Sequence, residues 1–297
     1  MDATVIGLSI QGFLSSLAQP WIFAAFGLCI GSFLNVVIHR KPRMAMREWV
    51  QDSAACLEID PAPHLEKHPE MTLSRPRSTC PSCGHQIRWY ENIPVLSWLA
   101  LRGRCSACGT RISIRYPLVE LATAGLFWAS ASLHPQMSDA LMWSLFWSVV
   151  LAAALIDMDT CYLLDDLTLP LMWAGLAWAA WQSPQALNTA VWGAMIGYLS
   201  LRSVHEGFLL LTGKEGMGHG DFKLLAAFGA WMSAWALLPI VLASCVAGLC
   251  WAVVQRVRRT APSDGRMPFG PFLALGALLV WSLTLPRVMA WLGLPGL

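Results

Sequence analysis

The two residues best placed to do chemistry are aspartates, and each lies at the end of an apolar run. Asp221 closes the glycine-rich motif 216–221 (GMGHGD) and is followed by the apolar run 224–228. Asp157 directly follows the apolar run 149–156 (VVLAAALI). The glycines before Asp221 let the backbone bend sharply and approach a substrate closely. Since a carboxylate held where lipid begins is costly, both aspartates are predicted to be functional.

Two such aspartates indicate an aspartyl-type hydrolytic site. Two carboxylates within a few ångström of each other do not both ionise easily, so the pair holds one shared proton. One carboxylate then activates water while the other protonates a leaving amine, which is hydrolysis of a peptide by general acid–base catalysis. The sequence does not show that Asp157 and Asp221 lie close together, so their pairing is a hypothesis.

The connection 157–166 contains three further acids, Asp159, Asp165 and Asp166. We interpret them as solvated loop residues or as helix caps. Either Asp165 or Asp166 is placed to cap the next span, because an anion at a helix N-terminus is favourable. The roles of three other polar residues near these acids stay open at this point: Lys223, His205 and His219.

Composition indicates a membrane protein. Of 297 residues, 56% are hydrophobic and 13% charged, whereas a soluble domain has about a quarter charged residues. Several apolar segments reach the roughly 20 residues that a bilayer requires, so we predict an all-α polytopic membrane protein with about eight transmembrane helices. They are 18–38, 117–134, 139–157, 166–183, 188–211, 222–237, 238–256 and 270–292. The sixth and seventh are divided at Pro239, because together they are too long for one span.

The N-terminus and the basic residues predict the topology. No basic segment precedes the first apolar stretch, which therefore resembles a first span, beginning near residue 18 or as early as Val5, rather than a removable signal peptide. Twelve of the 20 Lys and Arg residues lie between Arg40 and Arg115. Because positive loops stay in the cytoplasm, the long loop after the first span is predicted to be cytoplasmic, with both termini facing outward and the aspartates near the cytoplasmic face.

Three domains are expected on this basis. They are a first transmembrane span (1–40), a cytoplasmic cysteine-rich domain (41–116) and a seven-span membrane domain that contains both aspartates (117–297). Within the cytoplasmic domain, residues 45–78 are rich in Pro, Glu, Arg and His. This composition predicts a flexible or partly ordered segment before the cysteines.

Four cysteines form two Cys-x-x-Cys pairs in the cytoplasmic loop: Cys80, Cys83, Cys105 and Cys108. The 21 residues between the pairs are typical of a zinc site with four thiolates, which is structural because its shell is closed. Glycine after each pair permits the tight turn that points two sulfurs at one metal. Two unconnected dithiols or a redox pair are the alternatives, and His85 is a possible substitute ligand. The other five cysteines are predicted to pack as small apolar side chains: Cys29, Cys56, Cys161, Cys245 and Cys250.

Several motifs together resemble one family, the type IV prepilin leader peptidases, which are bacterial inner-membrane aspartic proteases. The motifs are 31–40 (GSFLNVVIHR), 91–94 (ENIP), 115–120 (RYPLVE), 157–170, 213–223 and 268–271 (PFGP). The resemblance covers nearly the whole chain, and the two cysteine pairs fall in the family's cytoplasmic domain. One departure is Leu164, where the family usually has proline. It loosens the turn before the fourth span and touches neither aspartate.

The resemblance implies a function with two steps. Asp157 and Asp221 would be the catalytic pair that removes the basic leader from prepilins and type II secretion pseudopilins, after a glycine and at the cytoplasmic face. The new N-terminal residue would then be N-methylated with S-adenosylmethionine as the methyl donor. No residues are assigned to the donor, since the chain has no Gly-x-Gly-x-x-Gly motif after a strand. The implied setting is a multi-pass protein of the bacterial inner membrane, with protein substrates and membrane lipid as partners and no nucleic acid.

Two other classes of protein fit part of the pattern. In a proton-coupled transporter, Asp157 and Asp221 would form a relay. Transporters tend to place such acids near the middle of the bilayer on interrupted helices, whereas these aspartates are predicted at one rim. In a membrane scaffold without catalysis, the cysteine loop would bind a partner. A cleavage assay with Asp→Asn variants separates the enzyme from the scaffold, and a flux assay in liposomes identifies a transporter.

Overall fold

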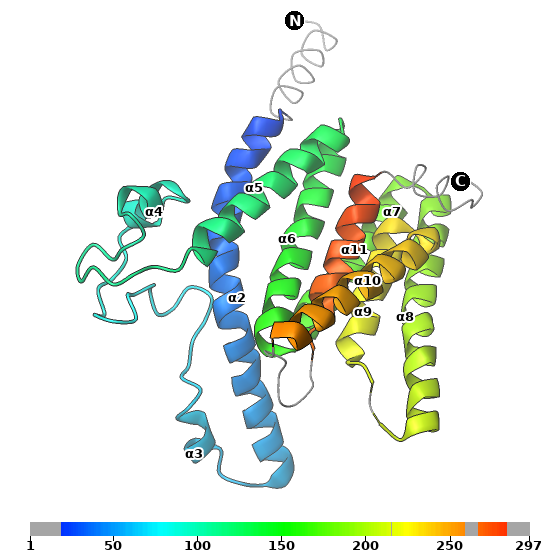
Figure 1. Ribbon diagram of the computed structural model, residues 1–297, viewed down its shortest axis with the longest axis horizontal. Coiled ribbons are helices and arrows are strands. Elements are labelled where there is room, and N and C mark those ends of the chain that lie inside the picture. Colours follow the sequence, from blue (N-terminus) through cyan, green and yellow to red (C-terminus); the bar gives the residue numbers. More distant parts are fainter. Residues whose placement is uncertain (1–18, 215, 259–266, 284–297) are drawn as a thin grey trace, which may run out of the picture. The chain divides into compact units, whose positions relative to one another are not determined.

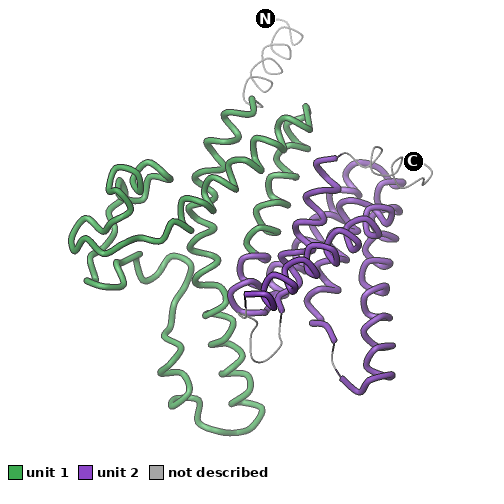
Figure 2. The backbone as a smooth tube through the Cα atoms, in the orientation of Figure 1, with its two compact units in different colours: residues 1–152 green, residues 153–297 purple. Residues whose placement is uncertain are grey.

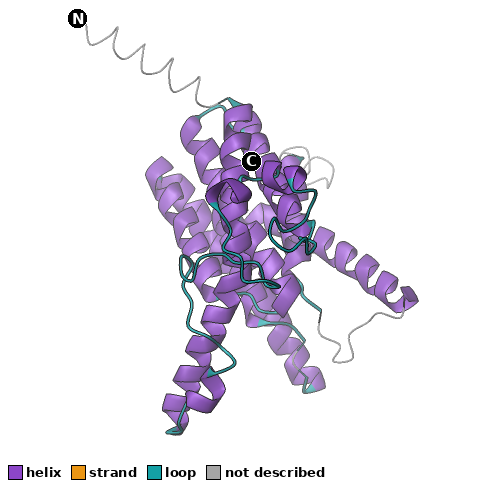
Figure 3. Cartoon of the chain, turned by 90° about the vertical axis from the view of Figure 1, so that its left-hand side faces the viewer, coloured by secondary structure: helices purple, strands orange, loops and turns teal. Residues whose placement is uncertain are grey.

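The computed structural model describes residues 19–214, 216–258 and 267–283. These residues form helices and loops, with two isolated β-bridges and no strand among them (Figure 3). The predicted all-α class is therefore confirmed. The chain divides into two compact units, residues 1–152 and 153–297 (Figure 2), and each is described by itself.

Unit 1 contains a long helix pair and the cysteine loop (Figure 1). Its elements are α2 (Pro20–Leu57), α3 (Ala62–Leu65), η1 (Trp89–Asn92), α4 (Leu96–Ala100), α5 (Arg115–Leu133) and the first part of α6 (Met137–Thr160). Two glycines one turn apart let α2 and α5 pack backbone to backbone. A Cβ at Gly27 would lie 2.7 Å from Ala124 Cα, and one at Gly31 would lie 2.6 Å from Glu120 Cα. Small residues at such contacts are typical of helix pairs in membranes.

Helix α2 extends well beyond the predicted first span. It continues from Ile38 through the proposed domain boundary at residue 40 and ends at Leu57. The segment 45–78, which was predicted to be flexible or partly ordered, is helical over residues 45–57. A polar stretch can be helical and exposed on all sides when it continues a helix whose apolar part is packed against protein or lipid. Composition alone does not distinguish such a helical extension from a loop.

Two buried or half-buried side chains of the helix pair hold the cysteine loop. The Arg40 guanidinium on α2 donates to the carbonyls of Thr72 and Pro76, each at 2.8 Å. Glu120 on α5 accepts from the backbone N–H of Val95 at 2.7 Å. Val95 has a positive φ of 60° and precedes α4. The loop is thus attached to the helices on both sides of the first cysteine pair.

Unit 2 is a helical bundle built around α9. Its elements are the end of α6, α7 (Asp165–Gln182), α8 (Pro184–Thr212), α9 (His219–Met232), α10 (Ala234–Arg258) and α11 (Gly270–Ser282). Helix α9 contacts α7, α8, α10 and α11, and most of its residues are buried. Gly193 and Gly197 on α8 permit the closest of these contacts. A Cβ at Gly193 would lie 2.1 Å from the Gly229 carbonyl oxygen, so larger residues would force the two helices apart.

Three of the described helices are long and apolar enough to cross a membrane, judged by length and composition: α2, α6 and α10. Each of the eight predicted spans overlaps at least one described helix, and the sixth overlaps both α9 and α10. The eight-span topology itself stays a prediction. The part of the first span before residue 19 and the part of the last span after residue 283 lie outside the described residues.

The predicted division between the sixth and seventh spans is wrong. The break lies at Ser233, which has a φ of 73° and separates α9 from α10. Pro239 instead lies inside α10. A proline close to the start of a helix removes a single backbone hydrogen bond, whereas the extended ψ of 166° and positive φ of Ser233 are not helical and end α9 directly.

The packing prediction for the five scattered cysteines is also wrong. The side chains of Cys29, Cys56, Cys161, Cys245 and Cys250 are all exposed on the chain. Four of them lie on α2 and α10, two of the helices that are apolar enough for a membrane. A thiol has low polarity, so it is compatible with an apolar helix surface even where no other part of the protein covers it.

Candidate active site and metal centre

Asp157 is a buried carboxylate near the C-terminal end of α6, with 4% of its surface exposed. Its Oδ2 atom accepts a hydrogen bond of 2.9 Å from the backbone N–H of Gly270, the first residue of α11. The first N–H groups of a helix have no partner within the helix, and they carry the positive end of its dipole. The start of α11 therefore orients the Asp157 carboxylate.

Asp221 lies in the first turn of α9 and is 6% exposed. The backbone of Gly218 hydrogen-bonds its carboxylate, and the charge of Asp157 acts on it directly. Its Oδ1 atom is buried and has no hydrogen-bond partner among the described residues. An unpartnered carboxylate oxygen is costly in a purely structural role, so this oxygen is the one available to water or substrate.

Leu163 forms an apolar wall beside both aspartates. A Cβ at Gly220, next to Asp221, would lie 2.5 Å from Leu163 Cβ. A Cβ at Gly270 would lie 3.2 Å from Leu163 Cδ2 and 2.8 Å from Asp157 Oδ2. The two glycines therefore let the chain close around the carboxylates. All of these residues belong to unit 2, so one compact unit brings the two predicted aspartates into a single site.

Replacing Gly270 by alanine is expected to lower any peptide hydrolysis by this aspartate pair by about 10- to 100-fold, because the new methyl group must push Asp157 Oδ2 aside and a displacement of about 1 Å costs that much. The measurement is kcat/KM for peptide hydrolysis, together with thermal unfolding. Gly207→Ala is the matched control, since a Cβ there meets nothing within 4 Å. A folded Gly270→Ala enzyme with the wild-type rate would contradict the role given to the Gly270 amide.

The three other acids of the segment 157–166, here called the outer acids (Asp159, Asp165 and Asp166), have a different environment from the buried pair. Asp165 and Asp166 lie in the first turn of α7, and the N-cap residue is Leu164, so neither acid is the cap. Asp165 accepts two hydrogen bonds from Lys223 Nζ, at 2.7 and 2.6 Å. Lys223 therefore forms an ion pair between α7 and α9. Asp159 is exposed on the last turns of α6.

The two histidines lie together beside the Asp221 helix. The ring of His205 on α8 is 5.3 Å from that of His219, the first residue of α9, and 5.4 Å from that of Phe222. His205 is buried, and its Nδ1 atom has no hydrogen-bond partner in the described part of the chain. These contacts fix the start of α9 against α8 and thereby position the turn that carries Asp221.

In unit 1 the two cysteine pairs form two copies of the same turn. In each copy, the N–H of the first cysteine donates to the carbonyl five residues later, at 2.8 Å for Cys80 and 2.9 Å for Cys105. Gly84 and Gly109 follow the pairs with φ values of 71° and 73°. This left-handed conformation favours glycine, so the predicted role of these glycines is confirmed.

The four sulfurs are arranged to bind one metal ion. The Sγ atoms of Cys80, Cys83, Cys105 and Cys108 all lie within 4.8 Å of one another, and those of Cys80 and Cys108 are 3.8 Å apart. Tetrahedral zinc with Zn–S bonds of about 2.3 Å separates its sulfurs by about 3.8 Å. The donor set and the spacing therefore fit a structural zinc ion, and His85 is outside the four-sulfur cluster.

Glu91 connects the two cysteine turns and was not predicted from the sequence. Its carboxylate accepts from the Arg88 backbone N–H at 2.8 Å and the Ser106 hydroxyl at 2.5 Å, and it pairs with His85 at 3.2 Å. The Arg88 and Ser106 hydrogen bonds, followed by His85, lower the pKa of Glu91 to about 2. The side chain is therefore a carboxylate at neutral pH, and it bridges residues next to both halves of the metal site.

Two other site residues escaped the sequence prediction, Gly270 and Leu163. A signal for Gly270 was present in the motif 268–271 (PFGP), because glycine and proline before an apolar run mark the start of a helix. That start is a source of free N–H groups. Nothing in the local sequence showed that Leu163 would contact glycines in two other helices.

Comparison with known proteins agrees with this site. The profile of the type IV leader peptidase family matches residues 144–253, which include both aspartates, and that of the bacterial peptidase A24 N-terminal domain matches residues 25–133, which include the four cysteines. The chain belongs to the type IV leader peptidase family. No solved structure shows significant similarity to it.

Three curated relatives carry the name prepilin leader peptidase/N-methyltransferase. The protein of Stutzerimonas stutzeri is 46% identical over 276 residues, covering 91% of this chain and 93% of the relative. That of Aeromonas salmonicida is 46% identical over 276 residues, covering 90% and 94%. That of Pseudomonas aeruginosa is 45% identical over 268 residues, covering 86% and 88%.

Proposed function

We propose that this chain removes the basic leader from prepilins and pseudopilins and then N-methylates the new N-terminal residue. The observation that carries the proposal is the pair of buried aspartates, Asp157 and Asp221, whose charges interact within the segment that matches the peptidase family. The names of the relatives support the second activity. Because the chain belongs to a family of membrane peptidases, it is an enzyme rather than a scaffold or a transporter.

In the proposed mechanism the two aspartates share one proton. The ionised carboxylate takes a proton from a water molecule, which attacks the carbonyl carbon of the scissile peptide bond, and the protonated carboxyl group delivers its proton to the leaving amine. The Gly270 N–H holds Asp157 in position, while Asp221 Oδ1 faces the reactants as the unpartnered oxygen. The apolar Leu163 side chain limits the access of other water to the pair.

The proposed location is the cytoplasmic rim of the bacterial inner membrane. A prepilin has an apolar helix after its leader, and that helix would lie in the bilayer beside the enzyme's own apolar helices. The scissile bond then reaches the depth of Asp157, which lies near the end of a helix long enough to span the membrane. The four-cysteine centre would hold zinc in a structural role, with S-adenosylmethionine as the second substrate.

The test uses the purified full chain in liposomes with a prepilin and a pseudopilin of the same secretion system. Mass spectrometry should show loss of the leader after glycine and, with S-adenosylmethionine present, addition of one methyl group to the new N-terminus. Products that retain the leader would reject the peptidase function. Cleaved products without the methyl group would reject the methyltransferase function alone.

We also propose that the outer acids attract the basic leader. Changing Asp159, Asp165 and Asp166 together to lysine should raise the apparent KM for a basic leader by roughly threefold or more, because these charges create a favourable local field. Asp165 also forms an ion pair with Lys223 at 2.6 Å. A leader whose basic residues are replaced by glutamine is the control. An unchanged KM for the basic leader would refute the idea.

A further inference from the structure

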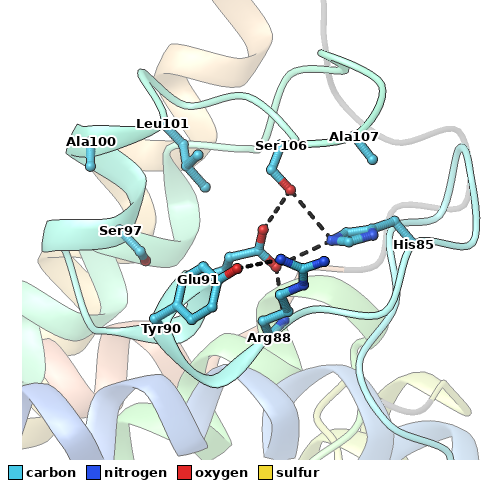
Figure 4. Close-up of a pocket in the computed structure, with 9 residues that line it drawn as sticks. All are labelled: His85, Arg88, Tyr90, Glu91, Ser97, Ala100, Leu101, Ser106 and Ala107. Carbon is cyan, nitrogen blue, oxygen red and sulfur yellow. Dashed lines mark hydrogen bonds and ion pairs between the residues drawn. The ribbon is translucent and has the colours of Figure 1, made fainter.

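The cysteine loop of unit 1 contains a pocket with no role in the peptidase chemistry. It has a volume of about 570 Å³ and lies between η1, α4 and the second cysteine turn (Figure 4). This volume is within the range of about 300–1,000 Å³ that small-molecule sites occupy. The size and the mixture of lining groups point to a small organic ligand.

The lining combines a cation, a carboxylate, an aromatic ring and an apolar side. The Arg88 guanidinium donates to the Tyr90 hydroxyl at 2.6 Å, and its central carbon lies 5.9 Å from the centre of that ring. Glu91 is held by the hydrogen bonds described above, and Figure 4 shows it among Arg88, Tyr90 and Ser106. Leu101 of the loop after α4 adds an apolar surface. The charged groups are therefore fixed in place before any ligand arrives.

We propose that this pocket binds the methyl donor, S-adenosylmethionine; the inference rests on the proposed methyltransferase function and assigns it a site. The donor has a carboxylate that matches Arg88, a sulfonium cation that matches the Glu91 carboxylate and the face of the Tyr90 ring, and an aromatic base that matches the apolar surface at Leu101. Carboxylate–guanidinium pairing and attraction of a cation to an aromatic face are established modes of recognition.

The methyl transfer itself balances without any further reactant. The neutral N-terminal amine of the cleaved substrate attacks the methyl carbon, a C–N bond forms as the C–S bond breaks, and the sulfur keeps the electron pair. The products are S-adenosylhomocysteine, which is uncharged at sulfur, and a methylated ammonium group that releases one proton to water. Glu91 stabilises the charged donor, and it interacts less strongly with the uncharged product.

This assignment separates the two activities. The pocket residues belong to unit 1 and the paired aspartates to unit 2, so cleavage and methylation use different side chains. The pocket also depends on the metal centre, because Ser106 and Ala107 in its lining are the two residues between Cys105 and Cys108. A folded second cysteine turn is thus a condition for a formed pocket.

The first experiment measures binding of S-adenosylmethionine to the purified full chain by isothermal titration calorimetry. Arg88→Ala and Tyr90→Leu should each raise the Kd by about tenfold or more. Leu99→Ala is the control, because this α4 side chain is 58% exposed and does not line the pocket. Zinc content and thermal unfolding establish that each variant is folded. Folded variants that bind with the wild-type Kd would overturn the assignment.

A second measurement is independent of small changes in folding. Glu91→Gln should weaken binding of S-adenosylmethionine more than binding of S-adenosylhomocysteine, because only the former has the sulfonium charge. The comparison is made within one variant, so any structural effect enters both Kd values. An equal loss for the two compounds, or none, would contradict the role of Glu91.

The outcomes distinguish this inference from the proposed function. A wild-type enzyme that methylates its substrate, while the folded pocket variants bind the donor normally, rejects the pocket alone. If Arg88→Ala raises the KM of the cleaved pilin and leaves the donor Kd unchanged, the pocket holds the methyl acceptor and the assignment is likewise rejected. A wild-type enzyme that neither binds the donor nor methylates rejects both.

Discussion

Replacing Asp157 or Asp221 by asparagine is expected to lower the rate of leader cleavage by about 100- to 10,000-fold. Asparagine has nearly the same shape as aspartate but neither accepts nor delivers the proton that general acid–base catalysis requires, and loss of such transfer costs about 10²–10⁴-fold. Both carboxylates are buried in one site. Because they act as a unit, the double variant should be scarcely slower than either single variant.

The measurement is single-turnover cleavage of a purified prepilin in liposomes, with substrate binding determined separately. The zinc content of both variants should equal that of the wild type, because the four cysteines are in the other unit. Asp52→Asn, at an exposed position of α2, is the matched control for the chemical change. If either variant cleaves at the wild-type rate, that aspartate is only a charge at the membrane rim, and the catalytic partner must be sought among the outer acids.

Asp157 and Asp221 could be proposed from the sequence because their position is unusual, whereas their surroundings depend on the tertiary structure. An acid at the end of an apolar run can be recognised from the sequence alone. The Gly270 amide that holds Asp157 is 113 residues away along the chain, and the Leu163 wall meets glycines from two different helices. No local pattern encodes such contacts, so the orientation of the site required the structure.

The cysteine turns were more predictable than the membrane helices. Cys-x-x-Cys followed by glycine specifies a turn through local geometry, and the structure has that turn twice. The end of α9 at Ser233 was missed because nothing in the residue type requires a positive φ there. Pro239 attracted the predicted break, since proline disfavours helix interiors, yet the helix begins early enough to include it. The role of Glu91 was missed because it arises only when the two turns come together.

Removing the zinc ion from the four-cysteine centre is expected to stop methylation, because the pocket proposed for the methyl donor depends on the folded cysteine loop. Between residues 58 and 114, all of which the structure describes, only Cys80 and Gly103 are buried. A segment with so small a core does not fold by apolar burial alone, and a structural zinc ion supplies about 10–16 kcal/mol of binding free energy to such a fold. Cys108→Ser removes one thiolate from the cluster of four and should release the metal.

Loss of the metal should unfold the second cysteine turn and with it the pocket that Ser106 lines. We therefore expect the methylation rate of Cys108→Ser to fall by about 100-fold or more, with a matching rise in the Kd for S-adenosylmethionine and faster amide hydrogen exchange over residues 80–112. Cys245→Ser, at an exposed position on α10, is the control for the same chemical change.

A Cys108→Ser enzyme that has lost its zinc but still binds the donor and methylates at the wild-type rate would show that the metal does not build this pocket. Because the proposed catalytic pair, Asp157 and Asp221, lies in the other unit, the methylation defect should exceed any defect in cleavage. The ratio of the two rates then measures how far the metal supports methylation.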